Sequence, residues 1–102
     1  MIDIKKKQEE IIQNKKNKGF NITDISKEFC LLYGEVSEAY EAYAKKKEDL
    51  GGELADVAIY LMGISELLNF NLEEEIIKKM EINKNRKYKL VNGVYVKEEK
   101  TN

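Results

Sequence analysis

Four carboxylates in two evenly spaced pairs are the residues of this chain best suited to chemistry. Glu35 and Glu38 are three residues apart, and so are Glu53 and Asp56. Residues three apart on an α-helix share a face, so each pair would project from one side of its helix. Two helices that face each other along these sides would bring four carboxylates together. Like charges held that close repel one another unless a cation lies between them.

The ligand chemistry of such a site favours a hard cation. The chain has no histidine and a single cysteine, so only oxygen ligands are at hand, and these suit Mg²⁺, with Mn²⁺ as a substitute. Di-iron bundles are the competing kind of metal site, but they normally require Glu-x-x-His on two helices. The lack of histidine also excludes a Ser–His–Asp triad, a histidine base and a zinc site with histidine ligands.

The two pairs differ in their sequence setting. Asp56 lies within the apolar run 54–61, and Glu53 falls about 50° from the centre of the apolar face of its helix. A carboxylate there must be paired, protonated or bound to a metal, because burying an unpaired charge is costly. Glu35 and Glu38 alone are common features of a solvated helix, so their interpretation as ligands depends on the opposite pair.

Four helices must hold these residues in place. Helical periodicity predicts helices over about residues 2–16, 24–46, 49–68 and 72–85. The apolar positions expected to line the core of the second helix are Ile25, Phe29, Leu32, Val36, Ala39, Tyr40 and Tyr43. Those of the third helix are Leu50, Leu54, Val57, Leu61, Ile64 and Leu68, and those of the fourth are Leu72, Ile76, Ile77, Met80 and Ile82. The expected fold class is all-α, a four-helix-type bundle.

The end of the chain has a different pattern. Asn92-Gly93 separates two short runs rich in β-branched and aromatic residues, 88–91 and 94–97, which is typical of a hairpin with a type I′ turn. A two-stranded hairpin is marginal on its own, so it should pack on the bundle or on a partner chain. We therefore expect one helical domain over residues 1–88 and a hairpin-like tail over residues 89–102.

The fourth helix carries a polar stripe. Lys79, Asn83 and Arg86 are spaced four and three residues apart, on one face. Cations near a helix C-terminus complement the helix dipole, which is one explanation of the stripe. The other is that the stripe binds phosphate oxygens, to which Arg86 offers bidentate hydrogen bonds.

Composition limits the other classes of function. Lys and Arg total 18 against 19 for Asp and Glu, a balance that argues against an electrostatic nucleic-acid binder. No stretch approaches the roughly 20 apolar residues of a membrane span, and the N-terminal segment lacks the apolar region of a signal peptide. A cytoplasmic protein without membrane or nucleic-acid partners is the default expectation.

Three segments together resemble a known family. They are GEVSEAYEA over residues 34–42, ELADVAIY over 53–60 and KKMEINKNR over 78–86. In this order they are similar to the MazG-like nucleotide pyrophosphohydrolases of the all-α NTP pyrophosphatase superfamily, whose hallmark is ExxE followed on the next helix by ExxD. The resemblance covers about residues 10–88.

The resemblance implies a fold, an activity and a site. It implies a helical bundle that assembles as a homodimer or homotetramer and hydrolyses an NTP or dNTP to the monophosphate and pyrophosphate with Mg²⁺. Carried over by motif, the metal ligands are Glu35, Glu38, Glu53 and Asp56. The substrate-binding residues are Lys79, Asn83 and Arg86. Either Glu35 or Glu38 would orient or deprotonate the water that attacks the α-phosphorus in line.

Two departures and two alternatives accompany this hypothesis. Many members carry an acidic residue where this chain has Gly34 and a glutamate where it has Gly52, which lowers the negative charge around the site. One alternative is a helical oligomeric regulatory or binding module whose acidic site is degenerate. The other is a phosphoribosyl-ATP pyrophosphohydrolase, and the base and sugar of the substrate remain open.

Overall fold

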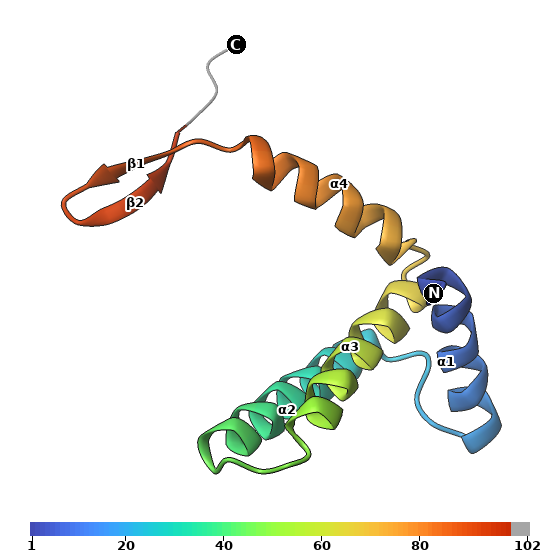
Figure 1. Cartoon of the computed structure of the whole chain (residues 1–102). Helices are drawn as coiled ribbons and strands as arrows, with labels where there is room; N and C mark the ends of the chain where they lie inside the picture. Colours follow the sequence, from blue (N-terminus) through green and yellow to red (C-terminus); the bar gives the residue numbers. More distant parts are fainter. Residues whose placement is uncertain (99–102) are drawn as a thin grey trace.

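Four helices and a two-stranded hairpin follow one another in the computed structural model, which describes residues 1–98 (Figure 1). The helices are α1 (Ile4–Lys18), α2 (Ile25–Ala44), α3 (Leu50–Leu67) and α4 (Leu72–Asn85). The strands are β1 (Tyr88–Val91) and β2 (Val94–Lys97). The predicted all-α class with a hairpin tail is confirmed, and each predicted helix end lies within two residues of the observed one. Residues 99–102 of the predicted tail lie outside the described part.

Local signals fix most of the helix ends. The side chains of Asp3, Asp24 and Asn71 each accept a hydrogen bond from the backbone N–H three residues further on, at the starts of α1, α2 and α4. Such caps satisfy amide groups that have no partner within the helix. Gly19 ends α1 with a φ of 71°, in the left-handed region that favours glycine.

Three of the helices pack into one unit. Helices α2 and α3 run side by side as a hairpin, and α1 packs on α3 (Figure 1). A Cβ at Gly63 of α3 would lie 3.3 Å from the side chain of Ile11, so glycine allows α1 and α3 to approach closely. The buried apolar core is small, consisting of Ile12, Ala39, Ala42 and Ile64.

Helix α4 and the hairpin extend away from the unit formed by α1, α2 and α3. Within the described residues, α4 makes its main tertiary contacts with α1, near the point where α4 begins, and the hairpin lies beyond its far end (Figure 1). The radius of gyration is 17.3 Å, whereas a compact domain of this length has about 13 Å. The expected four-helix bundle therefore does not form among the described residues of one chain, because α4 contacts α1 near its start and then diverges from α2 and α3.

The predicted apolar faces of α2 and α3 are also largely exposed. Val36, Tyr40 and Tyr43 on α2 and Leu54 and Leu61 on α3 were expected in the core but are exposed. The reason lies in the arrangement of the helices. Helix α1 covers the Gly63 side of α3, and Leu54 and Leu61 lie about 160–180° around the helix from Gly63. One side of the α2–α3 pair is thus left bare.

The hairpin forms as predicted. Asn92 and Gly93 have φ values of 51° and 78°, and positive φ at both central residues defines the type I′ turn. The register pairs Val91 with Val94 and Tyr88 with Lys97. All residues of both strands are exposed. No described helix is long and apolar enough to cross a membrane.

A buried glutamine sets the direction of α4. Gln8 of α1 is 0% exposed. Its amide nitrogen donates to the Phe70 carbonyl at 2.8 Å and to Glu66 at 3.2 Å, and its amide oxygen accepts from the Leu72 backbone N–H at 2.9 Å. One side chain therefore holds the end of α3, the α3–α4 connection and the start of α4 against α1.

Replacing this glutamine tests its structural role. We expect Gln8→Ala to lower the free energy of unfolding by about 2–3 kcal/mol, because the Phe70 carbonyl and the Leu72 N–H would lose their partner and a buried side chain would be removed. Urea denaturation followed by circular dichroism measures the loss. The matched control is Gln13→Ala on the exposed side of α1, where the amide bonds only Asn17 within the same helix. Equal losses for the two variants would contradict the assignment.

Candidate metal centre

Helices α2 and α3 bring three of the four predicted ligands together. Oxygens of Glu35, Glu38 and Glu53 all lie within 4.8 Å of one another. Asp56, one turn beyond Glu53 on α3, is outside this group. The predicted meeting of carboxylate pairs from successive helices therefore occurs, with Asp56 at its edge.

The inner carboxylates lack partners. Glu35 and Glu53 are half-buried, and Oε2 of each is shielded from solvent with no hydrogen-bond partner among the described residues. Glu38 and Asp56 are exposed. A buried carboxylate oxygen without a partner is costly, and a cation bound between the helices would remove that cost. The donor set consists of oxygens only, which fits Mg²⁺ or Mn²⁺.

Mutual repulsion marks the four carboxylates as one electrostatic group. Burial, followed by the charges of Glu38, Asp56 and Glu53, raises the pKa of Glu35. Burial, followed by the charges of Asp49, Glu38 and Asp56, raises the pKa of Glu53. Asp56 therefore acts on both inner carboxylates although its oxygens lie outside the close group. Such coupling is expected of ligands that share one cation.

The buried pair differs from the one that the sequence indicated. Periodicity favoured Glu53 and Asp56 as the shielded carboxylates, but Asp56 is exposed and the shielded oxygens belong to Glu35 and Glu53, one on each helix. Glu35 shares its side of α2 with the buried Ala39 and Ala42. Glu35 therefore lies on the buried side of α2, which periodicity alone did not indicate.

A buried ion pair supports the site from α1. Glu28 of α2, 2% exposed, accepts hydrogen bonds from Lys15 of α1 and, at 3.1 Å, from Asn21. The Lys15 ammonium also lies 5.0 Å from the ring centre of Tyr60 on α3. Tyr60 is one turn from Asp56, and its pKa is raised by burial and then by the charges of Glu35 and Asp56. This network joins all three packed helices beside the carboxylates.

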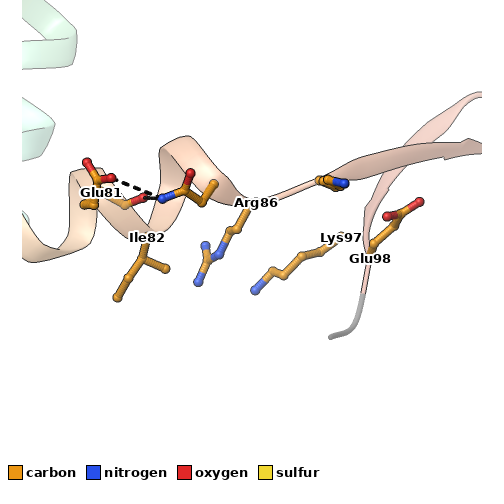
Figure 2. Close-up of a pocket in the computed structure, with 7 residues that line it drawn as sticks. Glu81, Ile82, Arg86, Lys97 and Glu98 are labelled. Atoms are coloured by element: carbon orange, nitrogen blue, oxygen red, sulfur yellow. Dashed lines mark hydrogen bonds between the residues drawn. The ribbon is translucent and has the colours of Figure 1, made fainter. Parts of the chain in front are cut away.

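The predicted substrate-binding residues of α4 do not reach these carboxylates within the chain. Lys79 and Asn83 are exposed and Arg86 is half-buried, on a helix that extends away from α2 and α3 (Figure 1). A pocket of about 710 Å³ lies where the end of α4 meets the end of β2. Arg86 and Lys97 both line this pocket, and Figure 2 shows their side chains extending in the same direction, one from the end of α4 and one from β2.

Lys97 is a candidate phosphate-binding residue that the sequence-based prediction missed. A signal was available, because the type I′ turn at Asn92-Gly93 fixes the register that pairs Lys97 with Tyr88. Tyr88 is two residues from Arg86, so the hairpin returns Lys97 to the end of α4. A third cation, after Lys79 and Arg86, thereby lies at the end of the predicted phosphate-binding stripe.

Comparison with known proteins yields no relative. No model of a known protein family matches the chain, and no match is found among curated proteins or solved structures. The case for a metal centre therefore depends on the carboxylate geometry and on the motifs that carry it.

Stability should depend on pH through the inner carboxylates. Their pKa values in the folded protein lie above the ordinary value of 4.5, so the folded state binds more protons than the unfolded state. The free energy of unfolding of the metal-free protein should then fall as pH rises from about 4.5 through the raised pKa values. We expect Glu35→Gln to reduce this loss of stability with rising pH. The melting temperature in EDTA, recorded from acid to neutral pH, measures the difference.

The control for this measurement is Glu41→Gln on the same helix. A hydrogen bond from Lys45 lowers the pKa of Glu41, so its charge favours folding as pH rises. Removing that charge should leave the decrease in stability with rising pH unchanged or make it slightly larger. A pH profile for Glu35→Gln that coincides with wild type would contradict the raised pKa.

Metal binding should depend on both inner carboxylates. We expect Mg²⁺ or Mn²⁺ at neutral pH to raise the melting temperature of the wild type. At a metal concentration a hundredfold above the dissociation constant, the free energy of unfolding should rise by about 2.7 kcal/mol. Glu35→Gln and Glu53→Gln should lose most of this effect, and Glu41→Gln should keep it. Stabilisation of equal size in all three variants would place the metal elsewhere.

Proposed function

We propose that the chain is a Mg²⁺-dependent nucleotide pyrophosphohydrolase of the MazG-like kind. It would hydrolyse a nucleoside or deoxynucleoside triphosphate to the monophosphate and pyrophosphate. The observation that carries the proposal is the pair of shielded, partnerless oxygens of Glu35 and Glu53 on facing helices, within 4.8 Å of an oxygen of Glu38. The order of the ExxE and ExxD motifs and the polar stripe after them support the nucleotide substrate.

Each acidic side chain has a role in this proposal. Glu35, Glu38 and Glu53 would hold Mg²⁺, with Asp56 adding charge at the edge of the group. When bound, Mg²⁺ neutralises the triphosphate and lowers the pKa of a coordinated water. Glu38 is exposed, so of the two candidate bases it is the one open to a water approaching from the substrate side.

The bond changes at phosphorus are those of a simple hydrolysis. Water oxygen attacks the α-phosphorus in line while the bond from that phosphorus to the α–β bridging oxygen breaks. Pyrophosphate leaves with the bonding electron pair, and a carboxylate, in this assignment Glu38, takes the proton of the water. Lys79, Asn83 and Arg86 would bind phosphate oxygens and offset the charge that develops on the leaving group.

The proposed enzyme is a homodimer or homotetramer. Supporting this assembly is the exposed apolar side of the α2–α3 pair, which includes Val36, Tyr40 and Leu61. Monomeric proteins rarely leave a continuous apolar surface of this kind uncovered.

Pyrophosphate release from a panel of NTPs, dNTPs and phosphoribosyl-ATP tests the proposal. We expect Mg²⁺-dependent release with the wild type and a loss of at least about 100-fold with Glu53→Gln or Asp56→Asn, because each removes charge from the metal centre. Glu41→Gln, on the same helix as Glu35 but outside the carboxylate group, should keep wild-type activity.

The other outcomes of this assay separate the alternatives. No metal-dependent release from any substrate would contradict the enzyme, and nucleotide binding without turnover would favour the regulatory or binding module. Release that survives both substitutions would place the active site elsewhere. Activity confined to phosphoribosyl-ATP would identify the chain as a phosphoribosyl-ATP pyrophosphohydrolase.

A further inference from the structure

The charge of the chain is divided between two segments. Residues 1–81 carry 12 cations and 17 carboxylates, whereas residues 82–97 carry five cations and no carboxylate. The overall balance of −1 therefore conceals a net charge of −5 in the first segment and +5 in the second. We call residues 82–97, the last turn of α4 and the hairpin, the basic arm. A segment this basic attracts polyanions even when the whole chain is nearly neutral.

The cations of the basic arm have no carboxylate partner within residues 1–98. Every ion pair formed there lies between residues 5 and 78. Arg86 is half-buried, and the lysines of the arm are exposed. The five cations are Lys84, Arg86, Lys87, Lys89 and Lys97. Their charge is therefore open to phosphate groups from outside the chain.

One face of the hairpin combines two of these cations with two aromatic rings. The register places Tyr88 opposite Lys97 and Leu90 opposite Tyr95, and residues two apart on a strand share a face. Arg86 precedes Tyr88 by two residues in extended backbone, so it continues the same face. Figure 2 agrees, because the side chains of Arg86 and Lys97 extend in the same direction. Tyr88 is 52% exposed and Tyr95 is 74% exposed.

Exposed aromatic rings beside cations are the surface that a single nucleic-acid strand recognises. Its unpaired bases stack on aromatic side chains, and its phosphates pair with nearby Lys and Arg. Diagonal neighbours across two antiparallel strands lie about 7–8 Å apart, so Tyr88 and Tyr95 offer two separate rings. In a duplex the bases are already stacked on one another and do not reach such rings.

A pocket adjoins this face where α4 meets the end of the hairpin. Its lining includes Arg86, Lys87 and Lys97 together with Glu81 and Glu98. The cations outnumber the carboxylates, so the pocket keeps a positive balance. Its volume of about 710 Å³ is that of a small-molecule site, which gives room for one nucleotide unit of a bound strand.

Charge distinguishes the hairpin from the other exposed aromatic residues. Tyr33, Tyr40 and Tyr43 of α2 are also exposed. Helix α2, however, carries four glutamates and a single lysine. Phosphates are repelled from that surface and attracted to the hairpin, so only the hairpin pairs aromatic rings with positive charge.

We propose that the basic arm binds single-stranded nucleic acid. Tyr88 and Tyr95 stack on two bases of the strand, and Arg86 and Lys97 bind phosphates beside them. Stacking and phosphate pairing read no base edges, so the binding is independent of sequence. A two-stranded hairpin is marginal in water, and a strand laid across its tyrosine face stabilises it. This binding does not rest on the proposed hydrolase function.

Fluorescence anisotropy with labelled oligonucleotides measures the binding. The probes are oligouridylate and oligodeoxyuridylate of about 15 nucleotides, close to the longest site of this kind, and a DNA duplex of equal length. EDTA in the buffer keeps metal from the carboxylates. At about 50 mM salt we expect single strands to bind with a dissociation constant of about 1–100 µM, and tighter than the duplex. The two single strands differ in the 2′-hydroxyl, so the tighter one shows whether RNA or DNA is preferred.

Variants of the hairpin separate stacking from charge. We expect Tyr95→Thr, which removes the ring at a position where threonine suits a strand, to lose about tenfold in affinity for single strands. Tyr95→Phe keeps a ring and should bind like the wild type.

The salt dependence tests the cations. The logarithm of the binding constant should fall with the logarithm of salt concentration at a slope of about −2 to −3, for three or four phosphate contacts. Lys97→Gln should reduce this slope by about 0.7. The matched control is Lys78→Gln, an exposed lysine of α4 that lies outside the basic arm and pairs with Glu75, and it should leave slope and affinity unchanged.

Photocross-linking of the wild-type protein locates the strand. Oligouridylate containing 4-thiouridine is irradiated with the protein, and mass spectrometry identifies the residues that carry an adduct. We expect adducts at Tyr88 or Tyr95. The exposed Tyr33 and Tyr43 of α2 are internal controls and should carry none.

Several results would overturn the proposal. These are no binding of single strands at about 100 µM protein, equal affinity for the duplex and the single strands, unchanged affinity in Tyr95→Thr, or adducts confined to α2. Phosphatidylserine vesicles that bind while the oligonucleotides do not would assign the arm to a membrane surface. A Tyr95→Thr variant that loses only self-association, measured by analytical ultracentrifugation, would assign the tyrosine face to a second copy of the chain.

Discussion

Repulsion among carboxylates at the contact between α2 and α3 is the constraint on which the structure depends. Glu35 and Glu53 lie on the two facing helices, and Oε2 of each is shielded with no hydrogen-bond partner among the described residues. Burial, and after it the charges of neighbouring carboxylates, raises the pKa of both side chains. A cation bound between the helices would resolve the conflict.

The other buried polar groups show that this conflict is local. Gln8 uses both ends of its amide, and Glu28 is bonded to Lys15 and Asn21. Both clusters are satisfied within the chain, and both hold α1 in place. The shielded oxygens of Glu35 and Glu53 have no such partners. Among residues 1–98, the oxygens of Glu35 and Glu53 are thus the exception, and a bound cation would supply the partner that they lack.

The sequence was sufficient for features that neighbouring residues determine. Asn71 caps its helix, Gly19 ends another and Asn92-Gly93 forms the expected turn, since each depends on residues a few positions away. The meeting of the two glutamate motifs was also predicted, because a short connection makes α2 and α3 adjacent. Helical periodicity could not predict which surface covers the apolar face of a helix. It cannot distinguish a core of the same chain from a surface for another chain, so Tyr40 and Leu61 were placed in the interior.

In the proposed assembly, association and ligand binding are linked. One chain alone leaves the apolar side of the α2–α3 pair exposed, with Val36, Tyr40 and Leu61 open to solvent. In the proposed homodimer or homotetramer, a second copy would cover this side. A ligand that binds the assembled state better than the single chain must shift the equilibrium toward assembly by its differential affinity. By the same linkage, dilution that separates the chains must weaken substrate binding.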